Sequence, residues 1–459
     1  MGKAAVVAGV IGVAAVAVVG GSYVVGGHIE SGFKDNVAAM NSGGLEVRII
    51  DYRRGLFGAE AQTMWTLADG EESIDFSVNH HIDHGPLPAG KAAQVSSVLV
   101  LPRDYADTVG AALQGRAPLE VQTLVGWSGE LLHRISSPDY EGKVGDDLDL
   151  AWGGIRGELT VSADGLRAQG SIEAPALDVR DPDGSALVME RMVLTLDSVR
   201  PQPYRFWTGP SSITLDRAAF SVGGEAMFEV NALRIGSMAS LDGDVVNLSV
   251  DFGAAKAVGG GETIEDLSLA LALERIDAGA LDAIARIAEE VGNAPGGQEA
   301  QQARLMEGLL EQLPVLLSRS PSIEVKKVGA RLAEGAAEFG ARVAYTSQGE
   351  AGGINPARDL AGNLHLSLPR ALLLRLVDMQ ERQTILDYVE EMEIEAEEQE
   401  IEDAVRAAVT ERIAGMTGDG LLQEKDGVLT TAMSYKDGGF KVNGRALQPG
   451  ELRALGLPF

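Results

Sequence analysis

The hydrophobic and polar positions of this chain alternate with a period of two over much of residues 45–275. The segment ESIDFSVNHHIDH is the clearest case, because Ile74, Phe76 and Val78 fall on one face of an extended chain. Similar segments follow at short intervals, and the Asp164-Gly165 pair between two of them is typical of a β-hairpin. We therefore expect a large antiparallel, meander-like β-sheet.

A helical period appears later in the chain. Residues 277–291 and 298–318 place aliphatic side chains on one side, although Pro314 interrupts the second stretch. Residues 370–416 predict a long helical region with a break near 380–383, and a terminal hairpin is expected over 427–444. Because a large sheet has an apolar face to bury, we expect these amphipathic helices to cover it, giving an α+β fold.

The first 27 residues have neither period. After Lys3, the run from Ala4 to Gly27 contains no charge. As a helix it would span roughly 33 Å, close to the ~30 Å hydrocarbon core of a bilayer. We expect it to be a transmembrane helix with the short N-terminus in the cytoplasm, because no net positive charge follows it.

A cleaved signal peptide is the alternative. The Ala15-Val16-Ala17 triplet has the shape of a cleavage site, but more apolar residues follow it and the run is longer than a usual signal. The sequence favours an uncleaved anchor over residues 1–27. Beyond it, we expect a β-rich region over 28–275 and an α/β region with long helices over 276–459.

Charge and cysteine content narrow the function classes. The chain has 459 residues, 67 acidic against 38 basic side chains, a net charge of −29 and no cysteine. This acidity argues against nucleic acid or anionic lipid headgroups as main ligands, since both reward clustered Lys and Arg. A disulfide framework and a cysteine zinc site are impossible.

The strongest candidate for a metal site is the group His80, His81, Asp83 and His84, which offers four common ligands within five residues. On a strand, His80 and His84 share one face and His81 and Asp83 the other, so the set is divided. Packing and hydrogen bonding are the expected roles of these histidines.

Three other motifs are weak. Gly126-Trp127-Ser128-Gly129 resembles a nucleophile elbow but has Glu130 in place of the final glycine. Gly259-Gly260-Gly261 lacks the Lys-Ser/Thr pair of a phosphate loop. The acidic run 390–403 is a candidate for binding cations or a basic partner, but is more typical of the solvated side of a helix.

The chain also resembles a known family. The segments IIDYRRGLFGAEAQ and HHIDHGPLP, then LLSRSPSIEVKKVGARLAEGAAEF, and a closing Tyr435 followed by Gly439-Phe440-Lys441-Val442-Asn443-Gly444 occur in order. Together they resemble the YdgA-like family of bacterial envelope proteins, a domain of unknown function. The resemblance implies a single anchor in the inner membrane of Gram-negative bacteria and a periplasmic domain, and it transfers no catalytic residue.

Two functions are consistent with these observations. The first is a non-enzymatic, membrane-tethered periplasmic protein, held by residues 4–27, that binds lipid or another apolar ligand along a curved sheet. The second is a periplasmic metal-dependent hydrolase that uses His80 and His84. No cofactor, catalytic residue or metal ligand is assigned under the first function.

Overall fold

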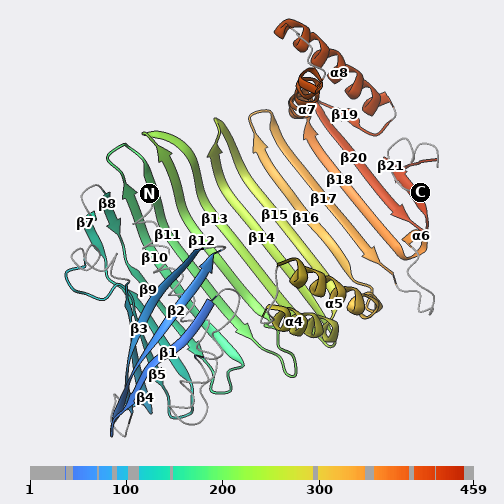
Figure 1. Cartoon of the computed structure of the whole chain (residues 1–459). Helices are drawn as coiled ribbons and strands as arrows, with labels where there is room; N and C mark the ends of the chain where they lie inside the picture. The colour runs from blue at the N-terminus through green and yellow to red at the C-terminus, as the bar shows by residue number, and fades with distance from the viewer. Residues whose placement is uncertain are drawn as a thin grey trace. The chain divides into compact units, whose positions relative to one another are not determined.

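The computed structural model describes residues 37, 45–69, 72–84, 90–101, 113–144, 148–292, 298–346, 356–391, 397–418 and 420–448. The expected anchor over residues 4–27 lies outside them. Strands make up 60% of these described residues, and all described strand pairs are antiparallel (Figure 1). The expected antiparallel sheet is therefore present. The chain divides into two units, which are described separately.

The first unit contains residues up to Asp244, residues 258–261 and Ala278–Pro314. Its strands are β1 (Leu45–Arg54), β2 (Gly58–Asp69), β3 (Glu72–His84), β4 (Ala93–Val100), β5 (Glu120–Val125), β6 (Leu131–Ser137), β7 (Tyr140–Val144), β8 (Leu148–Trp152), β9 (Ile155–Val161), β10 (Arg167–Arg180), β11 (Ala186–Val199), β12 (Gly209–Val222) and β13 (Glu225–Asp242). From β1 to β6 each strand pairs with the next; β6 then pairs with β9, and β9 to β13 again pair in order. In addition, β8 pairs with both β10 and β7.

The main hydrophobic core lies inside this unit. Trp65 and Phe76 stack with ring centroids 5.9 Å apart, and both belong to one buried cluster with Ile135, Leu159 and Leu177. Since these residues come from early and late strands, the sheet curls until its first strands face β9 and β10. The predicted alternation of β3 is confirmed, because Phe76, Val78 and Ile82 are all buried.

Four neighbouring strands of the first unit share an irregular row, formed by Pro175, Arg191, Asp216 and Ala232, at which the cross-strand pairing is interrupted. Arg191 has φ 35° and Ala232 has φ 51°, the left-handed region that L-residues seldom adopt. In β11 the side chains that pack on the core are at odd positions before this row, as at Met189, and at even positions after it, as at Met192. Both methionines nevertheless pack on the same core, so the irregularity absorbs the change of phase.

The second unit contains Val245–Ala257, Glu262–Asp277 and residues from Val315 onward. Its strands β15 to β18 pair in order and β18 pairs with β20, so five strands run side by side (Figure 1). The bounds are β15 (Glu262–Asp277), β16 (Ser322–Leu332), β17 (Gly335–Tyr345), β18 (Leu360–Pro369), β19 (Gln423–Lys425), β20 (Val428–Lys436), β21 (Gly439–Val442) and β22 (Arg445–Ala446), and β14 (Val245–Gly259) begins in this unit. The expected hairpin of β16 and β17 and the terminal hairpin of β20 and β21 are confirmed.

Two helices of the second unit, α7 (Arg370–Glu391) and α8 (Glu398–Gly418), bury their apolar side chains mainly against each other. Val405 is 1% exposed at the centre of this small cluster, and α7 begins where β18 ends. The helical region was expected to cover the sheet. It forms a hairpin beyond the strand ends instead (Figure 1). The expected break near residues 380–383 is wrong, because α7 is continuous there.

The remaining helices are α4 (Ala278–Gly292) and α5 (Gln298–Ser318), where two helices were predicted, and a single turn, α6 (Pro356–Asp359). A Cβ added to Gly308 of α5 would lie 2.8 Å from Cδ1 of Ile287, so α4 and α5 pack closely. Within the described parts of the chain, no helix has the length and apolarity that crossing a membrane requires.

Candidate functional site

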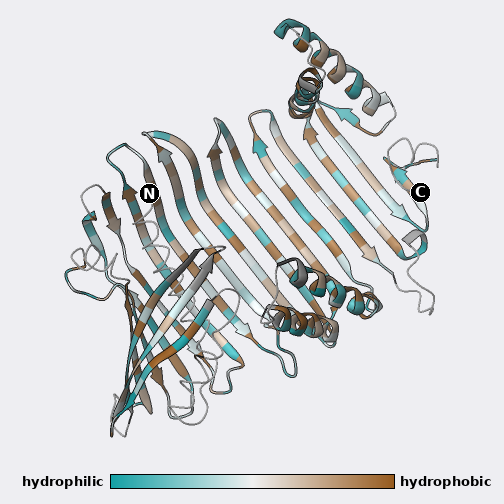
Figure 2. Ribbon diagram, in the orientation of Figure 1, coloured by the Kyte–Doolittle hydropathy of each residue, from teal (hydrophilic) through white to brown (hydrophobic). Residues whose placement is uncertain are grey.

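One face of the sheet in the second unit is apolar and largely uncovered. Residues opposite one another on β15, β16, β17, β18 and β20 form three rows that alternate with polar positions along each strand (Figure 2). We call these rows the apolar face; they are Leu273, Ile323, Val343, Gly362 and Tyr435, then Leu271, Val325, Ala341, Leu364 and Met433, and then Leu269, Val328, Phe339, Leu366 and Thr431.

Exposure is greatest at the centre of the first row. Ile323 is 60% exposed and its cross-strand partner Val343 is 51% exposed, while Leu271 and Leu273 retain more than a third of their surface. Single exposed aliphatic residues are ordinary, but neighbouring ones on several strands are typical of a surface that meets an apolar partner.

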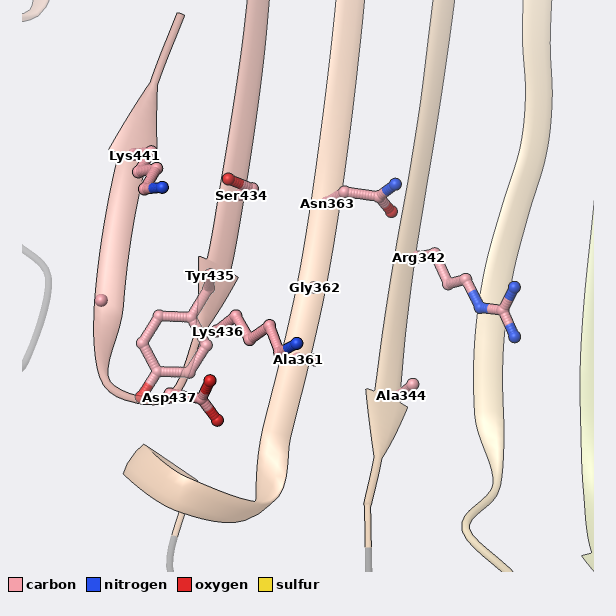
Figure 3. A pocket seen from close by; sticks show the side chains of 11 residues that line it. Arg342, Ala344, Ala361, Gly362, Asn363, Ser434, Tyr435, Lys436, Asp437 and Lys441 are labelled. Carbon is pink, nitrogen blue, oxygen red and sulfur yellow. The ribbon is translucent and has the colours of Figure 1, made fainter. Parts of the chain in front are cut away.

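The opposite face of the same strands carries a pocket of about 550 Å³, whose lining also includes Gly362 and Tyr435 from the end of the first row (Figure 3). Its floor is formed by the small residues Ala344 and Ala361, which pair with each other, and by Gly439, which pairs with Lys436. The next row bears longer polar side chains that form the rim: Arg342, Asn363, Ser434 and Lys441. A hollow follows directly from this sequence, since short side chains stand beside long ones on a flat sheet.

Charge in this pocket is unevenly balanced. The Arg342 guanidinium lies 3.2 Å from the Glu274 carboxylate and 4.0 Å from that of Glu324, so its charge is matched. Among the described residues, no carboxylate lies within ion-pair distance of Lys436 or Lys441. Asp437, at the turn between their strands, is the acidic member of the lining. Within the described part of the chain, the pocket therefore presents two ammonium groups without ion-pair partners, although the net charge of the whole sequence is −29.

The histidine cluster of β3 divides as the strand period predicts. His80 is 8% exposed and points into the first unit, whereas His81 lies on the outer face with Nε2 3.3 Å from Oδ1 of Asp83. His84 is in β3 opposite Ala93, and its side chain is outside the described set. Within the described residues, no group of three His, Asp or Glu side chains is placed to hold a metal ion.

His80 is held by hydroxyl groups on both sides. Its Nε2 lies 2.9 Å from Oγ1 of Thr63, and its Nδ1 lies 2.8 Å from Oγ of Ser97. The indole of Trp65 donates to the same Thr63 oxygen at 2.8 Å, which leaves the hydroxyl proton of Thr63 available to His80. Burial lowers the pKa of His80 to about 4, so the ring is neutral at physiological pH.

His133 is a second buried histidine that sequence patterns did not single out. Its Nδ1 lies 2.8 Å from Oγ1 of Thr123, and its Nε2 is buried without a hydrogen-bond partner among the described residues. Burial lowers its pKa to about 4 as well. The signal was present in the sequence, since His133 occupies an inward position of the alternating strand β6, between Leu131 and Ile135.

A smaller pocket of about 360 Å³ lies on the outer face of β1 to β4, close to His80 and His81. Asp51, Arg53, Glu60 and His81 contribute to its lining. Arg53 donates to Asp51 at 2.6 Å, and this contact raises the pKa of Arg53. Arg53 neutralises Asp51 and Glu60 adds a further negative charge, so the lining does not favour an anion.

The other sequence motifs are turns. Gly126–Gly129 closes the hairpin of β5 and β6, where the Gly126 amide donates to the Glu130 carbonyl at 2.8 Å. Trp127 is exposed there, and no helix follows, so the strand–turn–helix geometry of a nucleophile elbow is lacking. Gly259-Gly260-Gly261 is the turn between β14 and β15. In the acidic run, Ile401 is buried while Glu398 and Glu400 are exposed, as expected for the solvated side of a helix.

Sequence reasoning predicted an apolar sheet face but missed the pocket with Lys436 and Lys441. These lysines stand on either side of the Asp437-Gly438-Gly439 turn, where they look like ordinary solubilising charges. Only the pairing of β17, β18, β20 and β21 shows that a floor of small residues lies beside them.

Comparison with known proteins gives one family. No curated protein and no solved structure matches the chain. The family model described as a bacterial protein of unknown function, DUF945, matches residues 1–450. Since this match covers nearly the whole sequence, including the apolar face and the pocket, the chain belongs to the DUF945 family of bacterial proteins.

Proposed function

We propose that this protein is a membrane-tethered protein of the bacterial envelope that binds the acyl chains of a lipid without catalysing a reaction. The apolar face of the second unit carries the proposal. It places Ile323 and Val343 side by side, each more than half exposed, among aliphatic neighbours from five strands. A surface of this kind is stabilised when an apolar ligand removes it from water, at about 25 cal/mol for each Å² buried.

The dimensions of the apolar face suit an acyl chain. Strands in a sheet lie about 4.8 Å apart, so a row across five strands is about 19 Å long. Half of the ~30 Å hydrocarbon core of a bilayer, about 15 Å, is the depth that the chains of one lipid fill. A chain lying across the strands would therefore contact one row along most of its length.

The tether supports the same function. Residues 4–27 form an uncharged run of membrane-spanning length at the start of the chain. An anchor of this kind holds the β domain beside a bilayer, where lipids are concentrated. The hydrolase alternative gains no support from the described side chains, because both ring nitrogens of His80 already face hydroxyl groups.

Native mass spectrometry of the gently extracted full chain tests this function. We expect bound phospholipid in the wild type and its loss when Ile323 and Val343 are both changed to Asn. The matched control changes Lys327 and Glu338 to Asn. These residues are exposed on the opposite face of the same two strands, β16 and β17, and the exchange leaves the net charge unchanged.

Two results would contradict acyl-chain binding. One is a wild-type protein that carries no lipid and does not take up a fluorescent fatty acid. The other is equal loss of lipid in both double variants, which would point to general destabilisation. Circular dichroism of each variant, recorded beforehand, separates a folding defect from a binding defect.

A further inference from the structure

The pocket floored by Ala344 and Ala361 has properties that the acyl-binding proposal does not use. It lies on the polar face of the second unit, because its rim residue Arg342 and the apolar-face residue Val343 are successive on β17. We infer that it binds the phosphate group of a phosphorylated polyol, either free or carried as a lipid headgroup.

The anionic part of this ligand is indicated by Lys436 and Lys441. Within the described chain, neither ammonium group has a carboxylate within ion-pair distance, and both line the same pocket. Figure 3 shows Lys436 beside Ala361 on the floor and Lys441 on the neighbouring strand β21. A phosphate accepts charge-assisted hydrogen bonds from several donors at once, which two lysines on adjacent strands can supply.

The Arg342 guanidinium forms the edge of the pocket on the β17 side. One of its nitrogens lies 3.2 Å from Glu274 and 3.1 Å from the hydroxyl of Ser322. Because this network holds the guanidinium against carboxylates, Arg342 serves to close the rim. The excess positive charge is concentrated at the Lys436 and Lys441 side.

The polyol part follows from the remaining lining. Asn363 and Ser434 are opposite one another on β18 and β20, and the described structure gives neither side chain a hydrogen-bond partner. Asp437 can only accept hydrogen bonds when ionised, so it suits a ligand hydroxyl and disfavours a second anion. The volume of about 550 Å³ also exceeds what a single phosphate ion occupies.

Isothermal titration calorimetry of the full chain, in detergent and a phosphate-free buffer, tests the site. The probes are glycerol 3-phosphate, inorganic phosphate and glycerol, and we expect glycerol 3-phosphate to bind most tightly. Changing Lys436 and Lys441 to Gln should weaken it at least tenfold, while changing both to Arg should retain it. The control, Lys326→Gln with Lys425→Gln, removes two exposed charges of the same unit outside the pocket and should have less than a twofold effect.

A second experiment, with lipid vesicles, distinguishes a lipid headgroup from a free metabolite as the source of the phosphate. Flotation compares phosphatidylglycerol with phosphatidylcholine vesicles, which share acyl chains and differ in headgroup. Preference for phosphatidylglycerol that the Gln pair abolishes assigns the site to a lipid headgroup, and binding of glycerol 3-phosphate without such preference assigns it to a free metabolite.

The inference fails if neither glycerol 3-phosphate nor inorganic phosphate binds, or if the control pair weakens binding as much as the pocket pair. The polyol part of the inference fails if inorganic phosphate binds as tightly as glycerol 3-phosphate. The Ile323→Asn and Val343→Asn variant should leave this binding intact, so the acyl-binding proposal and the phosphate site can fail separately.

Discussion

Nε2 of His80 and Oγ1 of Thr63 lie 2.9 Å apart inside the first unit, and protonation of the imidazole would place a charge in a buried site. The pKa of His80 is lowered to about 4, below the usual 6.5 of an unfolded chain. Between these values the unfolded state binds more protons, so stability falls as the pH drops from about 6.5 to about 4, and above 6.5 this histidine contributes no pH dependence.

For His80→Gln, which keeps a polar side chain without the titration, we expect a shallower loss of stability on acidification. The difference from wild type should approach about 1.4 kcal/mol for each pH unit between pH 6 and pH 5. Urea unfolding at several pH values measures it. His81→Gln, on the exposed face of the same strand, is the control. A pH profile of His80→Gln parallel to wild type would show that His80 does not carry this dependence.

Thr63→Val should be destabilising although it preserves the shape of the side chain. Thr63 is 0% exposed, and its hydroxyl accepts from Trp65 and faces His80. Its removal leaves two buried polar groups short of a partner, at a cost of about 2–4 kcal/mol in the free energy of unfolding. Thr66→Val, which loses only a bond to the exposed Asp75, should cost less than about 1 kcal/mol. Equal costs would contradict the buried network.

Ala232→Gly should stabilise the protein. Ala232 has φ 51°, where glycine avoids the clash that a Cβ makes. After the entropic cost of glycine, we expect a gain of about 0.5 kcal/mol. Ala219→Gly, in a regular part of β12, should lose about 0.5–1 kcal/mol. Thermal unfolding of the two variants measures these effects. A shift of both midpoints in the same direction would contradict the prediction.

Val405→Ala should loosen the α7–α8 hairpin alone. Val405 is 1% exposed within a small cluster that also contains Val377 and Ile401. Its truncation should cost about 2 kcal/mol locally. Hydrogen exchange followed by mass spectrometry should show faster exchange in α7 and α8 with unchanged strands of the second unit. Glu411→Ala, on the exposed side of α8, should leave exchange unchanged, and spreading of the effect into β18 would contradict an independent hairpin.

Much of the fold could be predicted from period and turn chemistry. The strand of Phe76 and Val78 and the hairpin at Asp164-Gly165 are local features, because alternation and a glycine-containing turn specify them without long-range information. Residues 298–318 were predicted as a helix and form one, with Pro314 inside it.

What could not be predicted depends on contacts distant in sequence. The apolar pattern of α7 and α8 is consistent both with packing on the sheet and with a separate helical hairpin. Only the contact between the two helices shows that they form a hairpin. The phosphate pocket likewise needs Ala344 of β17 and Lys441 of β21 in one place, although they are far apart along the chain. His133 was missed because a lone histidine in an alternating strand resembles any inward polar residue.

The irregular row of Pro175, Arg191, Asp216 and Ala232 constrains how this protein can change its length. The alternation of β11 shifts there, and the pairing of all four strands is interrupted at positions that lie opposite one another. A chain that gained or lost one residue at this row in a single strand would turn half of that strand inside out, exposing core side chains and burying charged ones. Insertions and deletions within β10 to β13 are therefore tolerable only when all four strands change together, whereas the turns between them accept added residues freely.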